Sequence, residues 1–220
     1  VREGFALMAK ERSVTLEYTG SELGNEPPQS YSVLRARFDR WLAEQAEARG
    51  AMLLTKVRVD DVIRENGGIA GVIAGDDELR ADVVIACDGA LSLIPEKAGL
   101  RSPGSLHDYA VGIKEVIALD AGVINDRFGL EGNEGAARLF AGEVTRGLFG
   151  GGFLYTNRES ISLGIVIGIG GLAGHAPPPD VPALLDAFKE RPEIAPLIRG
   201  GATVEYAAHA IPEGGYRALG

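Results

Sequence analysis

Glycine is the residue that most constrains this chain, because it makes up 31 of the 220 residues, about twice the ~7% average. The glycines are dispersed through segments with a regular apolar pattern, so they do not form a low-complexity linker. Glycine adopts left-handed backbone conformations and lets another backbone or a ligand approach closely. The sequence therefore predicts short elements joined by tight turns, with bare backbone available for contact.

The clearest single element is a helix over residues 32–49. Leu34, Phe38 and Leu42 follow the helical period, Ser32 is placed as its N-cap, and Gly50 is a natural stop. Ahead of it, Ser13–Tyr18 alternates apolar and polar residues and is predicted to be a strand.

From residue 51 the apolar period changes to that of strands. A meander is predicted from strands at 52–59, 62–64 and 69–74, with an Asn-Gly-Gly turn at 66–68. Residues 81–87 then form a continuous apolar run, which is typical of a strand covered on both faces. This run ends at Asp88 and Gly89, and it leads us to expect that Cys87 is buried.

The second half reads as a sheet with helices on it. Strands are predicted at 109–119, 136–141, 147–155, 160–169 and 202–210. Asp180 is expected to cap a helix through Leu184, Leu185 and Phe188, and a short helical turn is expected at 194–198. The predicted fold class is α+β, with two lobes meeting near residue 100.

Composition and charge exclude several classes of function. Lys and Arg total 22 against 31 Asp and Glu, which gives a net charge of −9 and argues against nucleic-acid binding. One cysteine excludes an internal disulfide, a four-cysteine zinc site and an iron–sulfur cluster built from this chain alone, and three separated histidines make a metal site unexpected. No apolar run approaches the ~20 residues of a membrane span and no signal peptide is visible, so a cytoplasmic location is expected.

Three motifs are chemical candidates, and each has a plainer interpretation. Asp88-Gly89 follows a predicted buried strand, where ligands of open α/β sheets bind, but it is also a simple turn. Arg35 suits a diphosphate or ribose, but it also suits a solvent-exposed helix face. Gly150-Gly151-Gly152 offers bare backbone to a flat ring, but it also suits a bulge or hairpin bend. No GxSxG, HExxH, P-loop or GxGxxG pattern occurs, so no catalytic side chain and no metal ligand are predicted.

These segments resemble a known family in the order in which they occur. FAD-dependent oxidoreductases of the glutathione-reductase-like superfamily share features with YSVLRARFDRWL (31–42) and ADVVIACDG (81–89). Electron transfer flavoprotein–quinone oxidoreductases, and the FixC branch in particular, are similar to GGGFLY (150–155), IAPLI (194–198) and YAAHAIPEGG (206–215). The resemblance covers residues 5–220.

The same resemblance implies a middle fragment of such a protein. Family members begin with a GxGxxG unit and continue past this sequence into a Gly-Asp strand, and neither is present here. We therefore expect residues 1–30 to be an N-terminal segment with one strand, 31–100 to be part of the FAD-binding domain, and 101–220 to be the substrate or quinone-side domain. The whole is expected to be a partial Rossmann-like FAD-binding lobe plus a substrate-side antiparallel sheet with helices.

Site residues follow from the resemblance by position. It places Arg35 near the FAD diphosphate or ribose, the backbone of Val57 against the adenine edge, and Asp88 with Gly89 beside the ribose. It places Gly150 and Gly151 against a quinone ring. FAD is the implied cofactor of the full-length protein, whereas this fragment alone is expected to contain no FAD and to be inactive.

The implied activity is electron transfer. Electron transfer flavoprotein would reduce the FAD, which would pass electrons to quinone or, through a ferredoxin-like iron–sulfur protein, to a low-potential acceptor, a route linked to nitrogen fixation in relatives. The alternative is a flavin-dependent reductase or monooxygenase acting on an isoprenoid or aromatic substrate. Peripheral attachment to the inner membrane is a further alternative, through a patch at Phe149, Phe153, Leu154 and Leu172, although these residues also suit a buried strand face.

Overall fold

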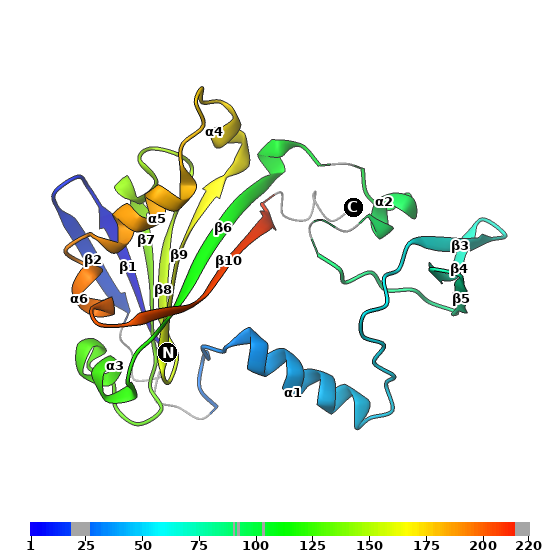
Figure 1. The fold of residues 1–220 in the computed structure, drawn as a ribbon, viewed down its shortest axis with the longest axis horizontal. Coiled ribbons are helices and arrows are strands. Elements are labelled where there is room, and N and C mark those ends of the chain that lie inside the picture. The colour runs from blue at the N-terminus through cyan, green and yellow to red at the C-terminus, as the bar shows by residue number, and fades with distance from the viewer. Residues whose placement is uncertain (19–26, 90, 92, 103, 214–220) are drawn as a thin grey trace. The chain divides into compact units, whose positions relative to one another are not determined.

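The computed structural model describes residues 1–18, 27–89, 91, 93–102 and 104–213 (Figure 1). Its contacts divide the chain into two units, and each is described by itself. The first unit contains Val1–Arg35 and Ala110–Ile211, and the second contains Ala36–Tyr109 together with the residues from Pro212 onward. The predicted boundaries at residues 30 and 100 therefore differ from the division that the contacts make.

The first unit is built on a seven-stranded sheet with the order β10-β6-β9-β8-β7-β1-β2 (Figure 1). Its strands are β1 (Arg2–Met8), β2 (Ser13–Tyr18), β6 (Tyr109–Ala118), β7 (Ala136–Gly142), β8 (Gly150–Thr156), β9 (Ser160–Gly168) and β10 (Ala202–Pro212). The pairs β6–β9, β8–β9, β7–β8 and β1–β2 are antiparallel, while β1 and β7 are parallel. The predicted antiparallel sheet with helices, and with it the α+β class, is confirmed.

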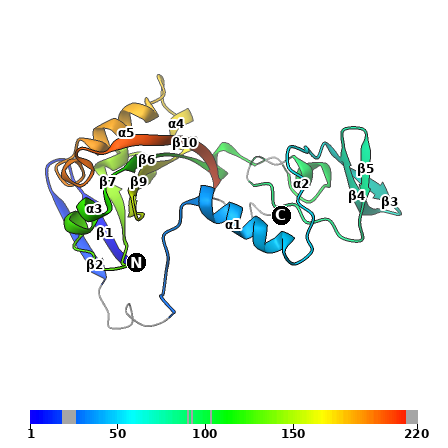
Figure 2. The same cartoon turned by 60° about the horizontal axis from the view of Figure 1, so that its bottom comes forward.

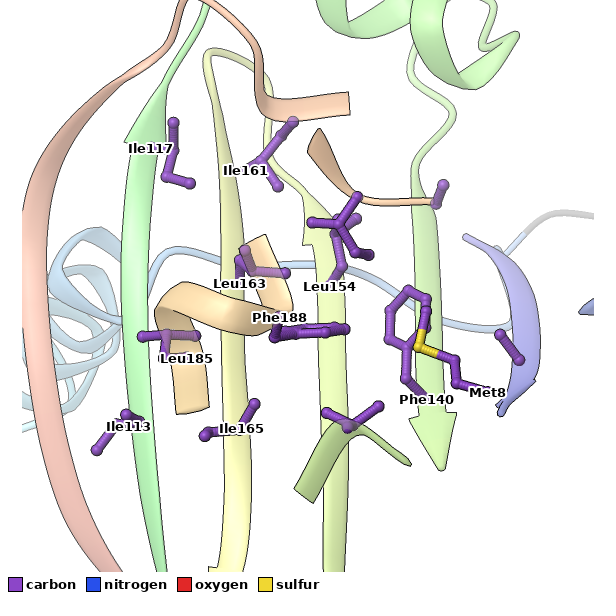
Figure 3. Close-up of a cluster of buried hydrophobic side chains, with 14 of the residues drawn as sticks. Met8, Ile113, Ile117, Phe140, Leu154, Ile161, Leu163, Ile165, Leu185 and Phe188 are labelled. Carbon is purple, nitrogen blue, oxygen red and sulfur yellow. The ribbon is translucent and has the colours of Figure 1, made fainter. Parts of the chain in front are cut away.

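Helices cover one face of this sheet and enclose the core. They are α3 (Ala121–Phe128), α4 (Ile169–Ala173), α5 (Val181–Lys189) and α6 (Ala195–Ile198), and α5 lies over the sheet in both views (Figures 1 and 2). From α5, Leu185 lies beside Ile113 on β6, whereas Phe188 extends the other way toward Phe140 on β7 (Figure 3). The rings of Phe188 and Phe140 pack edge to face with centroids 5.2 Å apart.

The predicted cap of α5 is confirmed, because the Asp180 carboxylate accepts a hydrogen bond from the Ala183 amide at 3.2 Å. The sequence did not reveal α3, although Asp120 caps it in the same way and Gly129 ends it at a φ of 60°. It also missed β1, so the described residues of the N-terminal segment form two strands and not the single one predicted. In β1 apolar residues point to both faces, because Ala6 and Met8 are buried while Phe5 and Leu7 are exposed, and the alternation that marks a strand is therefore absent.

In the second unit, helix α1 (Arg35–Glu47) starts inside the predicted range of 32–49. Its first residue, Arg35, is counted with the first unit. Ser32 is not its N-cap, because the Ser32 hydroxyl donates to the Thr156 carbonyl at 2.7 Å. The unit also contains β3 (Asp61–Glu65), β4 (Gly68–Ala74), β5 (Asp77–Arg80), α2 (Ile94–Lys97) and the short 3₁₀ helix η2 (Leu106–Asp108). The order β3-β4-β5 confirms the predicted meander.

Two predicted strands of the second unit are wrong. Residues 52–59 and 81–87 are irregular, and Met52 and Ile85 are 84% and 79% exposed. Cys87, expected to be buried, is also exposed. The physical reason is pairing: β5 takes the place beside β4, and no strand of the described residues lies alongside either segment, so apolar character alone does not fix them in a ladder.

Candidate functional site

Asp88 and Gly89 lie in the second unit, on an exposed segment between β5 and α2. Gly89 has a φ of 84°, and the space where a side chain would project is open. Only glycine adopts this conformation without strain, and it leaves the backbone accessible to a ligand. The pair therefore combines a carboxylate acceptor with bare backbone, which suits a ribose.

Val57 lies in the same unit but not in a strand. It is 49% exposed and directly follows Lys56, whose φ is 62°. This turn replaces the predicted strand, and Val57 itself lies in an irregular, exposed segment. The predicted contact to the adenine edge would use the backbone N–H and C=O of Val57, and these groups are available whether or not the residue lies in a strand.

Arg35 is the first residue of α1 and is exposed. Its guanidinium is a fork of donors suited to a diphosphate. It belongs to the first unit, whereas Val57, Asp88 and Gly89 belong to the second. The predicted FAD residues are therefore divided between the two units.

Gly150 and Gly151 lie in β8, within the sheet and not at a hairpin bend. A Cβ on Gly150 would collide with the carbonyl oxygen of Val166, and a Cβ on Gly151 with that of Phe140. Gly150 also has a φ of 147°. Close packing of β8 between its neighbours therefore accounts for both glycines without a ligand ring.

At β1, β2 and β7, the face of the sheet opposite the helices is exposed and apolar. Because side chains alternate along a strand, Leu139 points away from Phe140, and Leu7 points away from Met8. We call this surface the open face. Its exposed apolar residues, each between 42% and 65% exposed, are Phe5, Leu7, Val14, Leu16, Tyr18 and Leu139. A contiguous apolar patch of this kind marks a site of interaction.

Two aromatic rings extend the open face onto β8. Phe153 is paired with Leu139 on β7 and with Gly164 on β9, and its ring occupies the place that a Gly164 side chain would take. The ring of Tyr155 stacks beside it with centroids 6.1 Å apart. This wall of flat and aliphatic groups suits an apolar ring or chain. The sequence did not predict this wall, because the wall depends on the pairing of β1 with β7, and these two strands are far apart in the chain.

A charged pair borders the aromatic part of this face. Lys114 on β6 is the cross-strand partner of Gly164, and its ammonium lies 3.1 Å from the carboxylate of Glu205 on β10. The open face therefore changes from apolar at β1 and β2 to ionic at β6 and β10.

Among the described residues, the most buried carboxylate lies on the helix-covered face and is structural. Glu115, 6% exposed, accepts hydrogen bonds from Lys189 at 3.0 Å and Thr203 at 2.8 Å. Burial lowers the pKa of Lys189, but its bonds to Glu115 and Asp186 outweigh this and leave the pKa raised. The cluster fixes α5 to β6 and β10 and does not face the open side.

The patch predicted as a membrane contact is divided by the fold. Leu154 is buried in the core at 1% exposure, while Phe149 is 75% exposed. None of the helices in the described part of the chain has the length and apolar character that a membrane crossing requires. Within the same residues no cluster of metal-binding side chains occurs. Gly214 and Gly215 of the family-like PEGG segment lie outside the described residues.

Comparison with known proteins gives the family. A family model described as FAD binding domain matches residues 1–127. The chain belongs to this FAD-binding family. It is also 50% identical over 214 residues to the probable electron transfer flavoprotein-quinone oxidoreductase YdiS of Escherichia coli K12, covering 97% of this chain and 49% of that protein. The protein FixC of Salmonella typhi is 50% identical over 213 residues, with the same coverage of 97% and 49%.

These relatives confirm the resemblance to the FixC and electron transfer flavoprotein–quinone oxidoreductase group. The chain spans about half the length of the curated relatives that it matches. Among solved structures, a geranylgeranyl bacteriochlorophyll reductase-like protein from Thermoplasma acidophilum matches with a TM-score of 0.70 at 22% identity, covering 95% of this chain and 49% of that one. The flavin-dependent brominase Bmp2 matches with a TM-score of 0.64 at 12% identity, with coverage of 95% and 49%. At these identities the matches establish the fold alone.

Proposed function

We propose that this chain acts within an FAD-dependent oxidoreductase that accepts electrons from electron transfer flavoprotein and passes them to a quinone. The observation that carries the proposal is the 50% identity, across 97% of the chain, to a protein named as a probable electron transfer flavoprotein-quinone oxidoreductase. The open face supports the acceptor side, because a quinone presents a flat ring and an apolar chain.

The donor groups present fit FAD. Arg35 offers a cation to the diphosphate, Asp88 offers an acceptor to the ribose hydroxyls, and the exposed backbones of Val57 and Gly89 can meet the adenosine end. When bound, FAD supplies the electron-transfer chemistry. The chain's own residues bind and orient the cofactor, and none of them needs to donate a proton.

On the acceptor side, the role of the chain is to exclude water. Phe153, Tyr155 and Leu139 form the wall against which an apolar acceptor would lie. Gly150 and Gly151 need no ligand to explain their packing, but they lie in the part of β8 that precedes these aromatics, so their predicted place on the quinone side is retained as part of this proposal. A ferredoxin-like protein is the alternative acceptor, and the experiment below distinguishes it from a quinone.

The test uses the protein at the length of its curated relatives, under anaerobic conditions. Addition of reduced electron transfer flavoprotein should bleach the FAD absorbance at once, and a short-chain quinone should then restore it. Restoration only by a ferredoxin would replace quinone as the acceptor. Bleaching by NAD(P)H but not by electron transfer flavoprotein would contradict the proposal and favour a flavin-dependent reductase or monooxygenase.

The cofactor site has its own test in the same protein. Asp88→Ala should lower the flavin-to-protein ratio after purification, because loss of a charged hydrogen bond of roughly 1.5–3 kcal/mol weakens binding about tenfold or more. Asp76→Ala is the matched control, since Asp76 is an exposed carboxylate in the turn between β4 and β5. Equal flavin content in the two variants would remove Asp88 from the site.

A further inference from the structure

Strand β2 (Ser13–Tyr18) forms an outer edge of the seven-stranded sheet (Figures 1 and 2). Its inner side is paired with β1. On its outer side no strand among the described residues is paired with it. Natural edge strands are often protected by proline, a bulge or charged side chains. SVTLEY contains no proline, pairs with β1 without a register shift, and carries one charge, Glu17, which is already paired with Arg138.

The two faces of β2 differ sharply in character. Val14, Leu16 and Tyr18 lie on the open face and are 63%, 65% and 55% exposed. Thr15 and Glu17 lie on the other face, where Glu17 is held by Arg138 on β7 at 3.1 Å. An exposed edge with one apolar face is a template for another strand.

We propose that β2 pairs antiparallel with β2 of a second copy of this chain, about a two-fold axis at Leu16. In this register Val14 faces Tyr18 of the second copy, Leu16 faces Leu16, and Thr15 faces Glu17. All three apolar residues then meet apolar residues on one continuous face, and no like charges are opposed.

Other registers fail on the same residues. A shift of two residues toward the C-terminus sets Glu17 against Glu17 of the second copy, and like charges directly opposite are destabilising. A shift of two residues the other way leaves Tyr18 opposite Arg12. A shift of one residue turns the second copy over, so that Val14 or Leu16 faces Glu17.

The second copy is favoured over β10 as the occupant. β10 is the other edge of the sheet, and pairing β2 with it would be head to tail, which leaves a free edge at each end and builds open chains. β10 also ends in Pro212, which has no amide hydrogen to donate. The two-fold pairing closes after two copies. Because a six-residue strand pair is small beside the ~1,200 Å² of a standard interface, we expect a weak, concentration-dependent dimer.

Cysteine cross-linking tests the register directly. In a Cys87→Ser background, Leu16→Cys should give a disulfide-linked dimer on mild oxidation, because opposed Cα atoms lie about 4.5–5.5 Å apart and disulfides span about 4.4–6.8 Å. Val14→Cys is the matched control, being on the same face with nearly the same exposure. Two Val14 residues would be about 13 Å apart, since a strand rises about 3.3 Å per residue, so this variant should stay monomeric.

The outcomes separate cleanly. Equal cross-linking of the two variants, no cross-linking of either, or preferential cross-linking of Thr15→Cys would overturn the proposed axis. A second measurement follows association by sedimentation across a concentration series, comparing the unaltered chain with Leu16→Lys. The lysines would oppose each other at the axis, so the dimer should be lost while circular dichroism is unchanged. A monomer at every concentration, or a dimer indifferent to Leu16→Lys, would also overturn the proposal.

Discussion

Two apolar runs of this chain fold differently. In β9, Ile161, Leu163 and Ile165 are completely buried, and the strand is paired on both sides, with β6 and β8. In residues 81–87, Val83 and Ile85 are 73% and 79% exposed, and no described strand is paired with them. Both runs have the composition of a central strand. The difference teaches that an apolar run predicts burial only where the neighbours that complete its ladder are also in place.

The meander of the second unit shows that strands form where their pairing neighbours are present. β3, β4 and β5 follow one another directly and pair in sequence order, so each strand finds its neighbour locally. The exposed segments at 52–59 and 81–87 flank this meander. They include Val57 and lead into Asp88 and Gly89, so the proposed adenosine site lies in the less packed parts of the second unit.

The largest expected effect tests the packed unit. Phe188→Ala should lower the free energy of unfolding by about 3–5 kcal/mol, because it leaves a cavity between α5 and the sheet. Phe188 is 1% exposed and contacts the Phe140 ring. Urea denaturation followed by circular dichroism measures the loss. The control is Phe149→Ala, at 75% exposure, which should change stability by less than about 0.5 kcal/mol. Equal losses of stability in the two variants would contradict the placement of the core between α5 and the sheet.

A smaller loss is expected at the glycines of β8. Gly151→Ala should destabilise the chain by roughly 1–3 kcal/mol, because the new methyl group meets the Phe140 carbonyl of the neighbouring strand. Gly171→Ala in α4 is the control, since its methyl group would lie 3.6 Å from the Leu148 side chain, an ordinary contact. Thermal unfolding compares the two. Unchanged stability in Gly151→Ala would mean that strand packing does not require this glycine.

The dependence of folding stability on pH tests the ion pair between Glu193 and Arg191. Burial raises the pKa of Glu193, but hydrogen bonds, the largest from Arg191, outweigh this and leave the pKa below its ordinary value. A lowered folded-state pKa contributes stability above the unfolded pKa that is lost as pH falls through the folded pKa. Glu193→Gln should therefore lose less stability than the unaltered chain as the pH falls through the acidic range below the ordinary pKa of a glutamate. Urea midpoints measured across this range check it, with Glu190→Gln as control. Parallel acid curves for Glu193→Gln and the unaltered chain would refute the role of the pair.

The smallest effect is expected in the exposed run. Ile85→Ser should change the free energy of unfolding by less than about 0.5 kcal/mol, because the side chain is 79% exposed. Ile165→Ala provides the contrast, with an expected loss of about 2–5 kcal/mol from a fully buried site. A loss at Ile85 that matched Ile165 would show that residues 81–87 are packed, and the comparison between the two runs would fail.

Much of the fold could be predicted where the signal is local. Helix α5 was predicted correctly, because Asp180 is a recognisable N-cap and Leu184 and Phe188 follow it at helical spacing. The strands β6 to β9 were also predicted, because each is a run of apolar residues of strand length. By contrast, β1 has apolar residues on both faces and pairs in parallel with β7, more than a hundred residues away in the chain, so no local pattern revealed it.

The candidate site was predictable to a different degree at each residue. Arg35, Asp88 and Gly89 follow from motif resemblance, and the exposed left-handed Gly89 agrees with a contact made by backbone. The Gly150–Gly151 pattern signalled close approach of another group, but the strands β7 and β9 supply that group. The open face could not be predicted, because it exists only after β1, β2 and β7 are paired.

The most direct test of the account is FAD binding by this chain beside the protein at the length of its curated relatives. Fluorescence titration and flavin content after purification measure it for both. The account predicts a flavoprotein at full length and no stoichiometric FAD on the 220-residue chain, because Val57, Asp88 and Gly89 are proposed to contact only the adenosine end and this sequence contains no GxGxxG loop to hold the diphosphate. A yellow preparation of the chain with near-stoichiometric flavin would contradict it.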